Sequence, residues 1–318
     1  MKLIITIDTE EDNWGEFTSA DNSLENIKKI PVLQHLFDEF DVKPTYLITY
    51  AVATDERSIS ILRNLLDRDR CEIATHCHPW NTPPFEEVKN ERNSMLCNLP
   101  SDVQYRKLAT LHNLIKTNFD LEPISFRAGR WGYNNDVAMN IYKLGYSVDT
   151  SISPYMDWSH FHGPDFSTIP PDPFRFSPEN IIQSSPNGHM VEIPASVAFL
   201  QKNFALCAFL VALLRKRPMR YLGVMGILGK CNLVNKAWLS PELSDSNKMI
   251  SLTKGMMLNN HHIINMMFHS TSLKAGLSPF VKTKDDEKRF FQNIKEFLIF
   301  ARDNNILPVT LAEASKQI

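Results

Sequence analysis

A short apolar run near the start of the sequence limits the fold more than any other segment. Residues 2–7 read Lys-Leu-Ile-Ile-Thr-Ile and lead directly into Asp8, Glu10, Glu11 and Asp12. A run this short and rich in isoleucine predicts a buried strand rather than a helix. Successive strand residues point to opposite faces, so Asp8 and Glu10 share a face and could act on one metal or one substrate. Taken alone, these acids are equally well explained by a solvated turn.

Length and composition narrow the class of protein. The chain has 318 residues, of which 43% are hydrophobic and 22% are charged, as in an ordinary globular protein that can form one α/β barrel or two domains. A net charge of -2 argues against a nucleic-acid-binding protein with a broad basic surface. Five cysteines without a C-x-x-C pair indicate a reducing compartment. Because no secretory leader precedes the first strand, we expect a cytoplasmic protein.

Predicted strands and helices alternate along most of the sequence. Predicted strands cover 45–48, 71–75, 123–126, 146–148, 191–194, 263–268 and 306–309. Predicted helices cover 27–40, 58–66, 101–118, 136–144, 248–262 and 285–304, the last capped at Thr283. This alternation is typical of a parallel α/β architecture, in which the chemistry lies at the carboxyl ends of the strands.

The middle of the sequence interrupts the alternation. Residues 151–186 contain seven of the 19 prolines and predict a long ordered loop over the barrel mouth. An apolar helix over 199–214 follows, and a basic cluster covers 215–220. The longest apolar run, 204–214, is too short for a transmembrane helix, which needs about 20 residues. The helix could instead lie on a membrane surface or, more commonly, pack under the barrel. We expect one domain over 1–318, with a loop and helical insertion over 151–262.

Polar side chains follow several of the predicted strands. Asp8 and Glu10 end the first strand, His76 and His78 follow another, and Arg127 and His269 end two more. Each feature alone is more often structural, but their placement at the same end of successive strands predicts a catalytic site. Two imidazoles and a carboxylate are the usual protein ligands of a catalytic zinc. We therefore expect Glu10, His76 and His78 to bind one divalent metal, with zinc favoured.

Five segments resemble, in the same order, the motifs of a known family. They are Thr6-Ile7-Asp8-Thr9-Glu10, Val42-Lys43-Pro44-Thr45-Tyr46-Leu47, Thr75-His76-Cys77-His78-Pro79, Phe126-Arg127-Ala128-Gly129-Arg130-Trp131-Gly132 and Phe268-His269-Ser270. Together they resemble the NodB-homology polysaccharide deacetylases of carbohydrate esterase family 4. The resemblance covers most of the chain and implies a distorted (β/α)7 barrel.

The resemblance also implies roles for individual residues. Asp8 corresponds to the general base, Arg127 to the arginine that holds this base, and His269 to the general acid. Asp149 falls in the region of the fourth motif and is expected to orient His269. Two departures concern the metal ligands. Glu10 stands where the family has an acid directly after the base, and one residue rather than three separates the two histidines.

The expected reaction is the metal-dependent removal of an acetyl group from an N-acetylated sugar, glycan or lipid-linked glycan. Trp80, Trp131 and Trp158 are candidates to stack on sugar faces, and backbone N–H groups near Trp131 and Gly132 could stabilise the oxyanion. Two alternatives stay open. Allantoinase-like amidohydrolases of small non-sugar C–N substrates resemble the same pattern, and a non-catalytic barrel could bind glycan without cutting it. Peripheral membrane contact and the oligomeric state also stay open.

Overall fold

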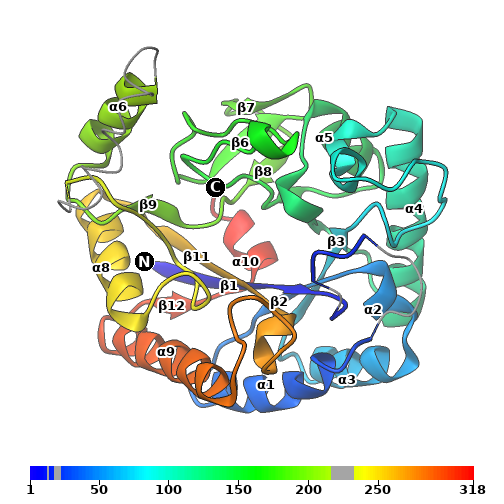
Figure 1. The fold of residues 1–318 in the computed structure, drawn as a ribbon, viewed down its shortest axis with the longest axis horizontal. Coiled ribbons are helices and arrows are strands. Elements are labelled where there is room, and N and C mark those ends of the chain that lie inside the picture. The colour runs from blue at the N-terminus through cyan, green and yellow to red at the C-terminus, as the bar shows by residue number, and fades with distance from the viewer. Residues whose placement is uncertain (13, 18–22, 216–232) are drawn as a thin grey trace.

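A parallel sheet surrounded by helices forms the centre of the molecule, for which a computed structural model describes residues 1–12, 14–17, 23–215 and 233–318 (Figure 1). Over these residues the parallel strands are, in spatial order, β11 (Ile263–His269), β1 (Lys2–Thr9), β2 (Thr45–Ile48), β3 (Glu72–Cys77), β4 (Ser125–Ala128), β5 (Val148–Asp149) and β8 (Met190–Glu192). A further short strand, β12 (Leu307–Pro308), pairs in parallel with β1. The predicted α/β fold with seven principal parallel strands is thus confirmed.

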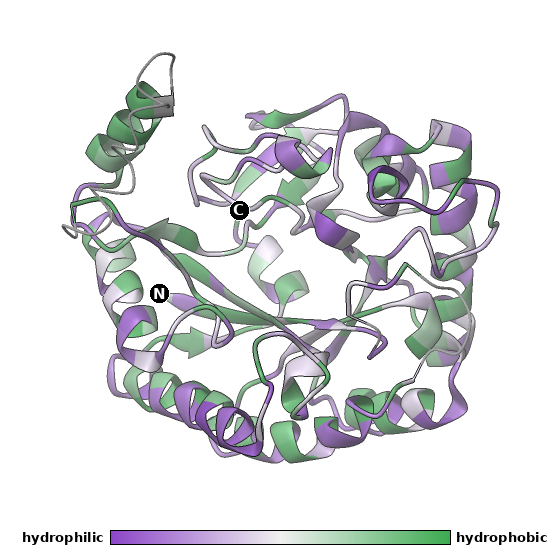
Figure 2. Ribbon diagram, viewed as in Figure 1, coloured by the Kyte–Doolittle hydropathy of each residue, from purple (hydrophilic) through white to green (hydrophobic). Residues whose placement is uncertain are grey.

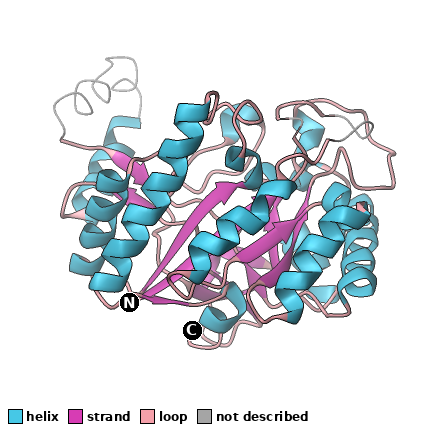
Figure 3. Ribbon diagram, turned by 90° about the horizontal axis from the view of Figure 1, so that it is seen from below, coloured by secondary structure: helices cyan, strands magenta, loops and turns pink. Residues whose placement is uncertain are grey.

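The described helices lie mostly on the outside of this sheet, and the last of them lies inside the barrel. They are α1 (Ile30–Asp38), α2 (Tyr50–Thr54), α3 (Glu56–Asp67), α4 (Ser101–Phe119), α5 (Asn135–Lys143), α6 (Phe204–Arg215), α8 (Ser246–Leu258), α9 (Lys284–Asp303) and α10 (Leu311–Ser315). Short 3-10 helices cover Ile27–Lys29, Arg92–Ser94, Leu96–Asn98, Gly129–Trp131, Ser159–Phe161 and Ser270–Leu273. Figure 3 shows helices in front of the strands and on both sides of them. None of the described helices combines the length and the hydrophobicity that crossing a bilayer requires.

The alternation of side chains in β1 explains how the barrel is filled. Leu3, Ile5 and Ile7 belong to the large outer core, which also contains buried residues of α1, α3 and α9. Ile4, on the opposite face, belongs to a small inner core with Leu311 of α10. The other buried members of this inner core are Val148, Val191, Ile193 and Ala314. Because α10 and this core fill the amino end of the barrel, the carboxyl end is left for a pocket.

The barrel is distorted at the seam between β8 and β11. Among the described residues these two strands do not pair with each other, and the chain after β8 lies between them. The Ser196 N–H donates to the Asn265 carbonyl oxygen at 3.0 Å, and the Asn265 N–H donates to Ser196 Oγ at 2.8 Å. The Leu239 carbonyl then accepts from the Met267 N–H at 3.1 Å. Backbone of the insertion therefore closes the ring.

The insertion differs in detail from the sequence-based expectation. The expected loop over 151–186 contains a hairpin, β6 (Phe174–Ser177) and β7 (Asn180–Ser184), which extends the sheet beyond β8. The prolines of this segment are typical of a loop, so the alternation of Phe174 and Phe176 was not recognised as a strand in the sequence. The helix expected over 199–214 begins only at Phe204, because β9 (Val197–Phe199) pairs with β10 (Lys236–Trp238). Residues 216–220 of the basic cluster lie outside the described part of the chain.

Candidate active site

The carboxyl ends of the strands bring the predicted site residues together. Asp8 of β1 lies beside His269 of β11 in the parallel register, and His76 of β3 lies beside Arg127 of β4. These four side chains line one pocket of about 480 Å³ together with Glu10 and His78. Asp149 and Gly132 are not among the residues that line it.

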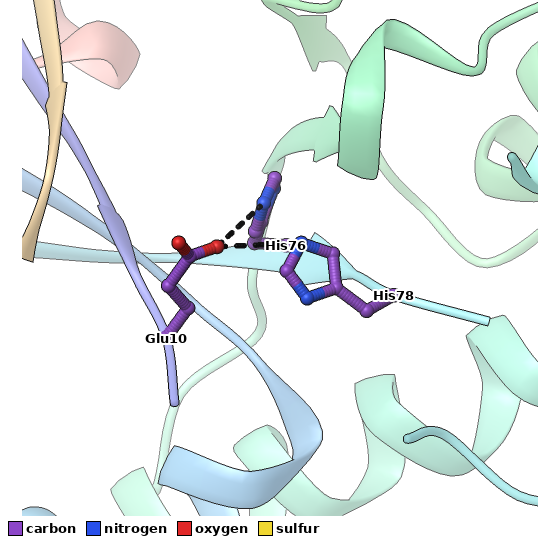
Figure 4. Close-up of side chains that lie close together, drawn as sticks. All are labelled: Glu10, His76 and His78. Atoms are coloured by element: carbon purple, nitrogen blue, oxygen red, sulfur yellow. Dashed lines mark ion pairs between the residues drawn. The ribbon is translucent and has the colours of Figure 1, made fainter. Parts of the chain in front are cut away.

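The side chains of Glu10, His76 and His78, which line this pocket, point toward one another (Figure 4). One ligand atom from each lies within 4.8 Å of the other two. Nε2 of His78 is 3.4 Å from Glu10 Oε2, and Nε2 of His76 is 3.9 Å from the same oxygen. His76 lies in β3, and Glu10 and His78 directly follow β1 and β3, the two strands that flank β2, so the sheet fixes their spacing.

The second nitrogen of each histidine is already engaged. Nδ1 of His76 lies 3.0 Å from the Arg127 carbonyl oxygen, which can only accept a hydrogen bond. Nδ1 of His78 lies 3.3 Å from Oε1 of Glu11, whose other oxygen accepts from Thr49. Imidazoles that bind metal usually donate their other N–H to a carbonyl or a carboxylate in this way. The contact with the carbonyl oxygen makes Nδ1 of His76 the donor and leaves its Nε2 free to accept, and the Nε2 atoms of both histidines face Glu10.

The electrostatics of the cluster also fit a cation. Burial raises the pKa of Glu10 to about 7, although His269 and His78 oppose this shift. Burial lowers the pKa of His76 to about 3, so this imidazole is neutral. A divalent cation would stabilise the ionised form of this buried carboxyl group and could bind the neutral imidazole beside it. The residues present therefore fit a zinc-type ligand set.

Gly129 and Trp80 hold His78 in place. A Cβ atom on Gly129 would lie 2.3 Å from His78 Cδ2 and 2.8 Å from the Cys77 carbonyl oxygen, so only glycine permits this approach. The Trp80 ring stacks on the His78 ring at 4.1 Å, and its Nε1–H donates to Glu11 Oε1 at 3.3 Å. Trp80 is only 8% exposed. It lines the pocket but mainly supports His78, rather than presenting a face to a sugar as we expected.

Asp8 forms a buried ion pair with Arg127. Arg127 Nη1 donates to Asp8 Oδ1 at 2.6 Å, and the other hydrogen bonds of the guanidinium go to Thr6 Oγ1 and to both oxygens of Thr150. Burial would raise the pKa of Asp8, but nearby positive charges, above all that of Arg127, lower it to about 2. The second oxygen, Oδ2, lies 3.7 Å from His269 Nε2. Asp8 is thus an ionised carboxylate with one oxygen directed toward the pocket.

His269 is held by Glu242, a residue of the insertion. Glu242 Oε2 lies 3.0 Å from His269 Nδ1, and Oε1 accepts from the His269 backbone N–H at 3.0 Å and from the Ser272 hydroxyl. The Trp14 ring packs edge-on against the imidazole at 4.6 Å. Burial alone would lower the pKa of His269, but the charges of Glu242, Glu10 and Asp8 raise it to about 10. His269 is therefore an imidazolium at neutral pH.

Asp149 does not orient His269, and this expectation is wrong. Its carboxylate accepts from the Ser151 N–H at 3.1 Å and from Ser151 Oγ at 2.7 Å, and it hydrogen-bonds with Glu192, its neighbour in β8. Burial and the charge of Asp149 raise the pKa of Glu192 well above its usual value, so the buried pair retains a proton. The next residue, Thr150, contacts Arg127, and strand alternation turns Asp149 to the opposite face.

The backbone N–H of Gly132 also differs from the sequence-based expectation that it could face an oxyanion in the pocket. This N–H donates to the Gly129 carbonyl oxygen at 3.0 Å within a tight turn, instead of facing the pocket. A Cβ atom there would lie 2.9 Å from the Leu96 nitrogen, so Gly132 permits close packing against that segment.

All five tryptophans of the sequence line the pocket. Trp131 and Trp158 stack at 6.4 Å with an interplanar angle of 11°, and Trp238 lies 5.7 Å from Trp131. Sequence reasoning missed Trp14, Trp238, Glu11 and Glu242. Trp14 and Glu11 lie next to the first motif, where proximity could have indicated them. Trp238 and Glu242 lie in the insertion, where no motif marks them.

The chain thus combines a distorted α/β barrel with a candidate metal-dependent active site, and the same fold occurs in known structures. A putative polysaccharide deacetylase from Mycobacterium smegmatis aligns with a TM-score of 0.51 at 14% identity, over 96% of this chain and 92% of that one. A putative glycoside hydrolase/deacetylase from Parabacteroides distasonis gives 0.61 at 11%, over 99% and 70%. A 4-alpha-glucanotransferase from Thermococcus litoralis gives 0.54 at 11%, over 100% of this chain and 40% of that one.

No family profile and no curated protein matches the sequence. At such low identities, the likeness to the three structures shows the fold. It agrees with the barrel that the resemblance to polysaccharide deacetylases implies.

Proposed function

We propose that this protein is a metal-dependent hydrolase that removes the acetyl group from an N-acetylated sugar or glycan. One observation carries the proposal: Asp8 and His269 face each other at 3.7 Å beside the converging Glu10, His76 and His78. A base, an acid and a ligand set for one divalent metal, which we propose to be zinc, therefore meet at the end of the barrel that is open to a substrate.

Asp8 is the general base of this mechanism. Because Arg127 holds the pKa of Asp8 near 2, the carboxylate is ionised throughout the neutral range. Oδ1 is fixed by Arg127, so Oδ2 accepts the proton from the attacking water. A divalent cation held by Glu10, His76 and His78 would polarise the amide carbonyl and make that water more acidic.

His269 is the general acid. An amine leaves readily only when its nitrogen is protonated, and the raised pKa of His269 keeps a proton on the imidazole. Glu242 binds Nδ1, which directs Nε2–H toward the pocket and balances the charge of the imidazolium. Glu242 is thus a positioning residue for the acid.

The aromatic wall favours a sugar as substrate. Trp131, Trp158 and Trp238 present aromatic surface on one side of the pocket, and such rings stack on the apolar faces of sugars. A small non-sugar amide is the second candidate, because a pocket of about 480 Å³ is also of the size that encloses a small molecule. A non-catalytic glycan-binding barrel would not require the base, the acid and the ligand set together.

The proposal is tested by measuring acetate release. Protein reconstituted with one equivalent of zinc should release acetate from at least one N-acetylated mono- or oligosaccharide, and metal-free protein should not. If metal-loaded protein cleaves only small cyclic or linear amides, the second candidate is the correct one. If it binds sugars but cleaves no C–N bond, the proposed function is wrong.

Glu242→Gln should shift the alkaline limb of the pH profile to lower pH. The mechanism needs His269 protonated, so activity falls as pH rises through the pKa of His269. Removing the charge that does most to raise this pKa lowers it, by roughly 1–2 units for a close ion pair. The measurement is kcat/KM against pH. Glu39→Gln, which removes a surface partner of Lys295, is the control and should leave the profile unchanged. An unchanged profile for Glu242→Gln would show that another group titrates.

A further inference from the structure

Helix α6 is apolar on all sides. Residues 204–214 form an unbroken run of eleven apolar residues. The inner face, which is buried, consists of Phe204, Cys207, Val211 and Leu214. A helix that is hydrophobic all round is normally enclosed by protein or by lipid. Figure 2 shows α6 green along its length, whereas α9 alternates between polar and apolar residues.

The outer face of α6 is exposed. Leu206, Phe209 and Leu213 are 52%, 63% and 41% exposed. Their spacing of three and four residues places them in one stripe along the helix, with Ala205 and Ala212 exposed beside them. No described part of the chain covers this stripe, and Figure 1 shows α6 projecting from the edge of the molecule beyond α8.

The first turn of α6 is fixed to the body of the protein. The Phe204 ring stacks near His261 at 5.7 Å, contacts Phe199 at 6.4 Å, and lies against Gly255 of α8. The helix emerges between β9 and β10, and β10 ends in Trp238 of the pocket wall. The exposed stripe is therefore held on the same two-stranded element as part of the substrate pocket.

We propose that the outer face of α6 binds the surface of an anionic lipid bilayer. The sequence of residues 215–232 contains five basic residues (Arg215, Lys216, Arg217, Arg220 and Lys230) and no acidic one. Basic residues next to an apolar helix face match anionic headgroups above an acyl boundary. A second copy of the chain, bound through a symmetric contact of α6, is the alternative occupant that the test below distinguishes.

The helix lies along the membrane rather than across it. A helix of 12 residues is about 18 Å long, whereas the hydrocarbon core of a bilayer is about 30 Å thick. Docking at a membrane also identifies the substrate, an inference that rests on the function proposed above. The substrate is an N-acetylated sugar carried by a membrane lipid. Docking itself does not depend on that function, since it can be measured without turnover.

Liposome flotation tests the docking. The wild-type protein should float with vesicles of phosphatidylglycerol and phosphatidylcholine, bind pure phosphatidylcholine more weakly, and be released by high salt. Phe209→Glu should lower the partition coefficient by at least about tenfold, because it places a charge where an aromatic ring entered the lipid. Val32→Glu is the matched control: Val32 is a 55% exposed apolar residue in α1, on another side of the molecule, and this variant should bind like the wild type.

Three results would overturn the inference. The wild type could fail to float with anionic vesicles, or Phe209→Glu could float as well as Val32→Glu does. Sedimentation velocity could also show a dimer that Phe209→Glu dissociates, which would assign α6 to self-association. Acetate release from a soluble N-acetylated sugar, measured on the same variants, reports separately on the proposed function and should be equal in all three proteins.

Discussion

Replacing His78 with alanine should remove the metal and, with it, measurable turnover. His78 offers Nε2 at 3.4 Å from Glu10 and is fixed by Glu11, Trp80 and Gly129. Loss of an outer-shell partner alone weakens metal binding by about 10–100-fold, so loss of a ligand should weaken it by more than about a hundredfold. The measurement is zinc content after dialysis, together with acetate release at saturating zinc.

Two variants make this result specific. Glu11→Gln keeps all three ligands and loses only the charge that holds His78, so we expect intermediate zinc affinity. His112→Ala changes a histidine of α4 outside the pocket and should retain full zinc content. If His78→Ala retained one equivalent of zinc, the ligand set would be assigned incorrectly.

Replacing Asp8 with asparagine should abolish nearly all turnover while zinc stays bound. Asparagine keeps the shape of the side chain and can still accept from Arg127, but it cannot take a proton from water. Loss of a general base lowers kcat by roughly 10²–10⁴-fold. Glu10, His76 and His78 remain in place, so zinc content should match that of the wild type.

Asp149→Asn is the matched control for Asp8→Asn. Asp149 also lies at the carboxyl end of a buried strand, but it is paired with Glu192 and does not line the pocket. This variant should therefore retain most of its kcat. Equal losses in the two variants would show that Asp8 is not the base. Loss of zinc from Asp8→Asn would instead show that Asp8 belongs to the ligand set.

The Asp8 pair also predicts how stability depends on pH. The folded-state pKa of Asp8, about 2, lies below the value of about 3.9 for an unfolded chain. The contribution of the pair is therefore complete above pH 4–5 and is lost as pH falls toward 2.

Much of the site was predictable because its residues end parallel strands. Strand alternation places Asp8 and Glu10 on one face, and it does the same for His76 and His78. The carboxyl ends of parallel strands meet at one edge, which brings Arg127 and His269 to the same place. These relations need only local sequence patterns and the general geometry of a parallel sheet.

The remaining residues depend on contacts that no local pattern encodes. Glu242 reaches His269 from a segment 27 residues away, without regular spacing. Asp149 was expected in the site because of its position in the order of the motifs. Successive strand residues point to opposite faces, however, so Thr150 contacts Arg127 and Asp149 contacts Ser151 instead. The hairpin β6–β7 was missed because its prolines are also typical of loops.

The pairing of β1 with β11 has a consequence for synthesis of the chain. β1 ends at Thr9 and β11 begins at Ile263, so roughly 250 residues separate two strands that lie side by side. At about 5–20 residues per second, a ribosome needs roughly 12–50 s to make that interval. During this time β1, whose residues Leu3, Ile5 and Ile7 form an apolar face, exposes a row of unpaired N–H and C=O groups to other chains. The nascent protein should therefore depend on a chaperone until β11 leaves the ribosome. Only then can Asp8 and His269 come to lie side by side.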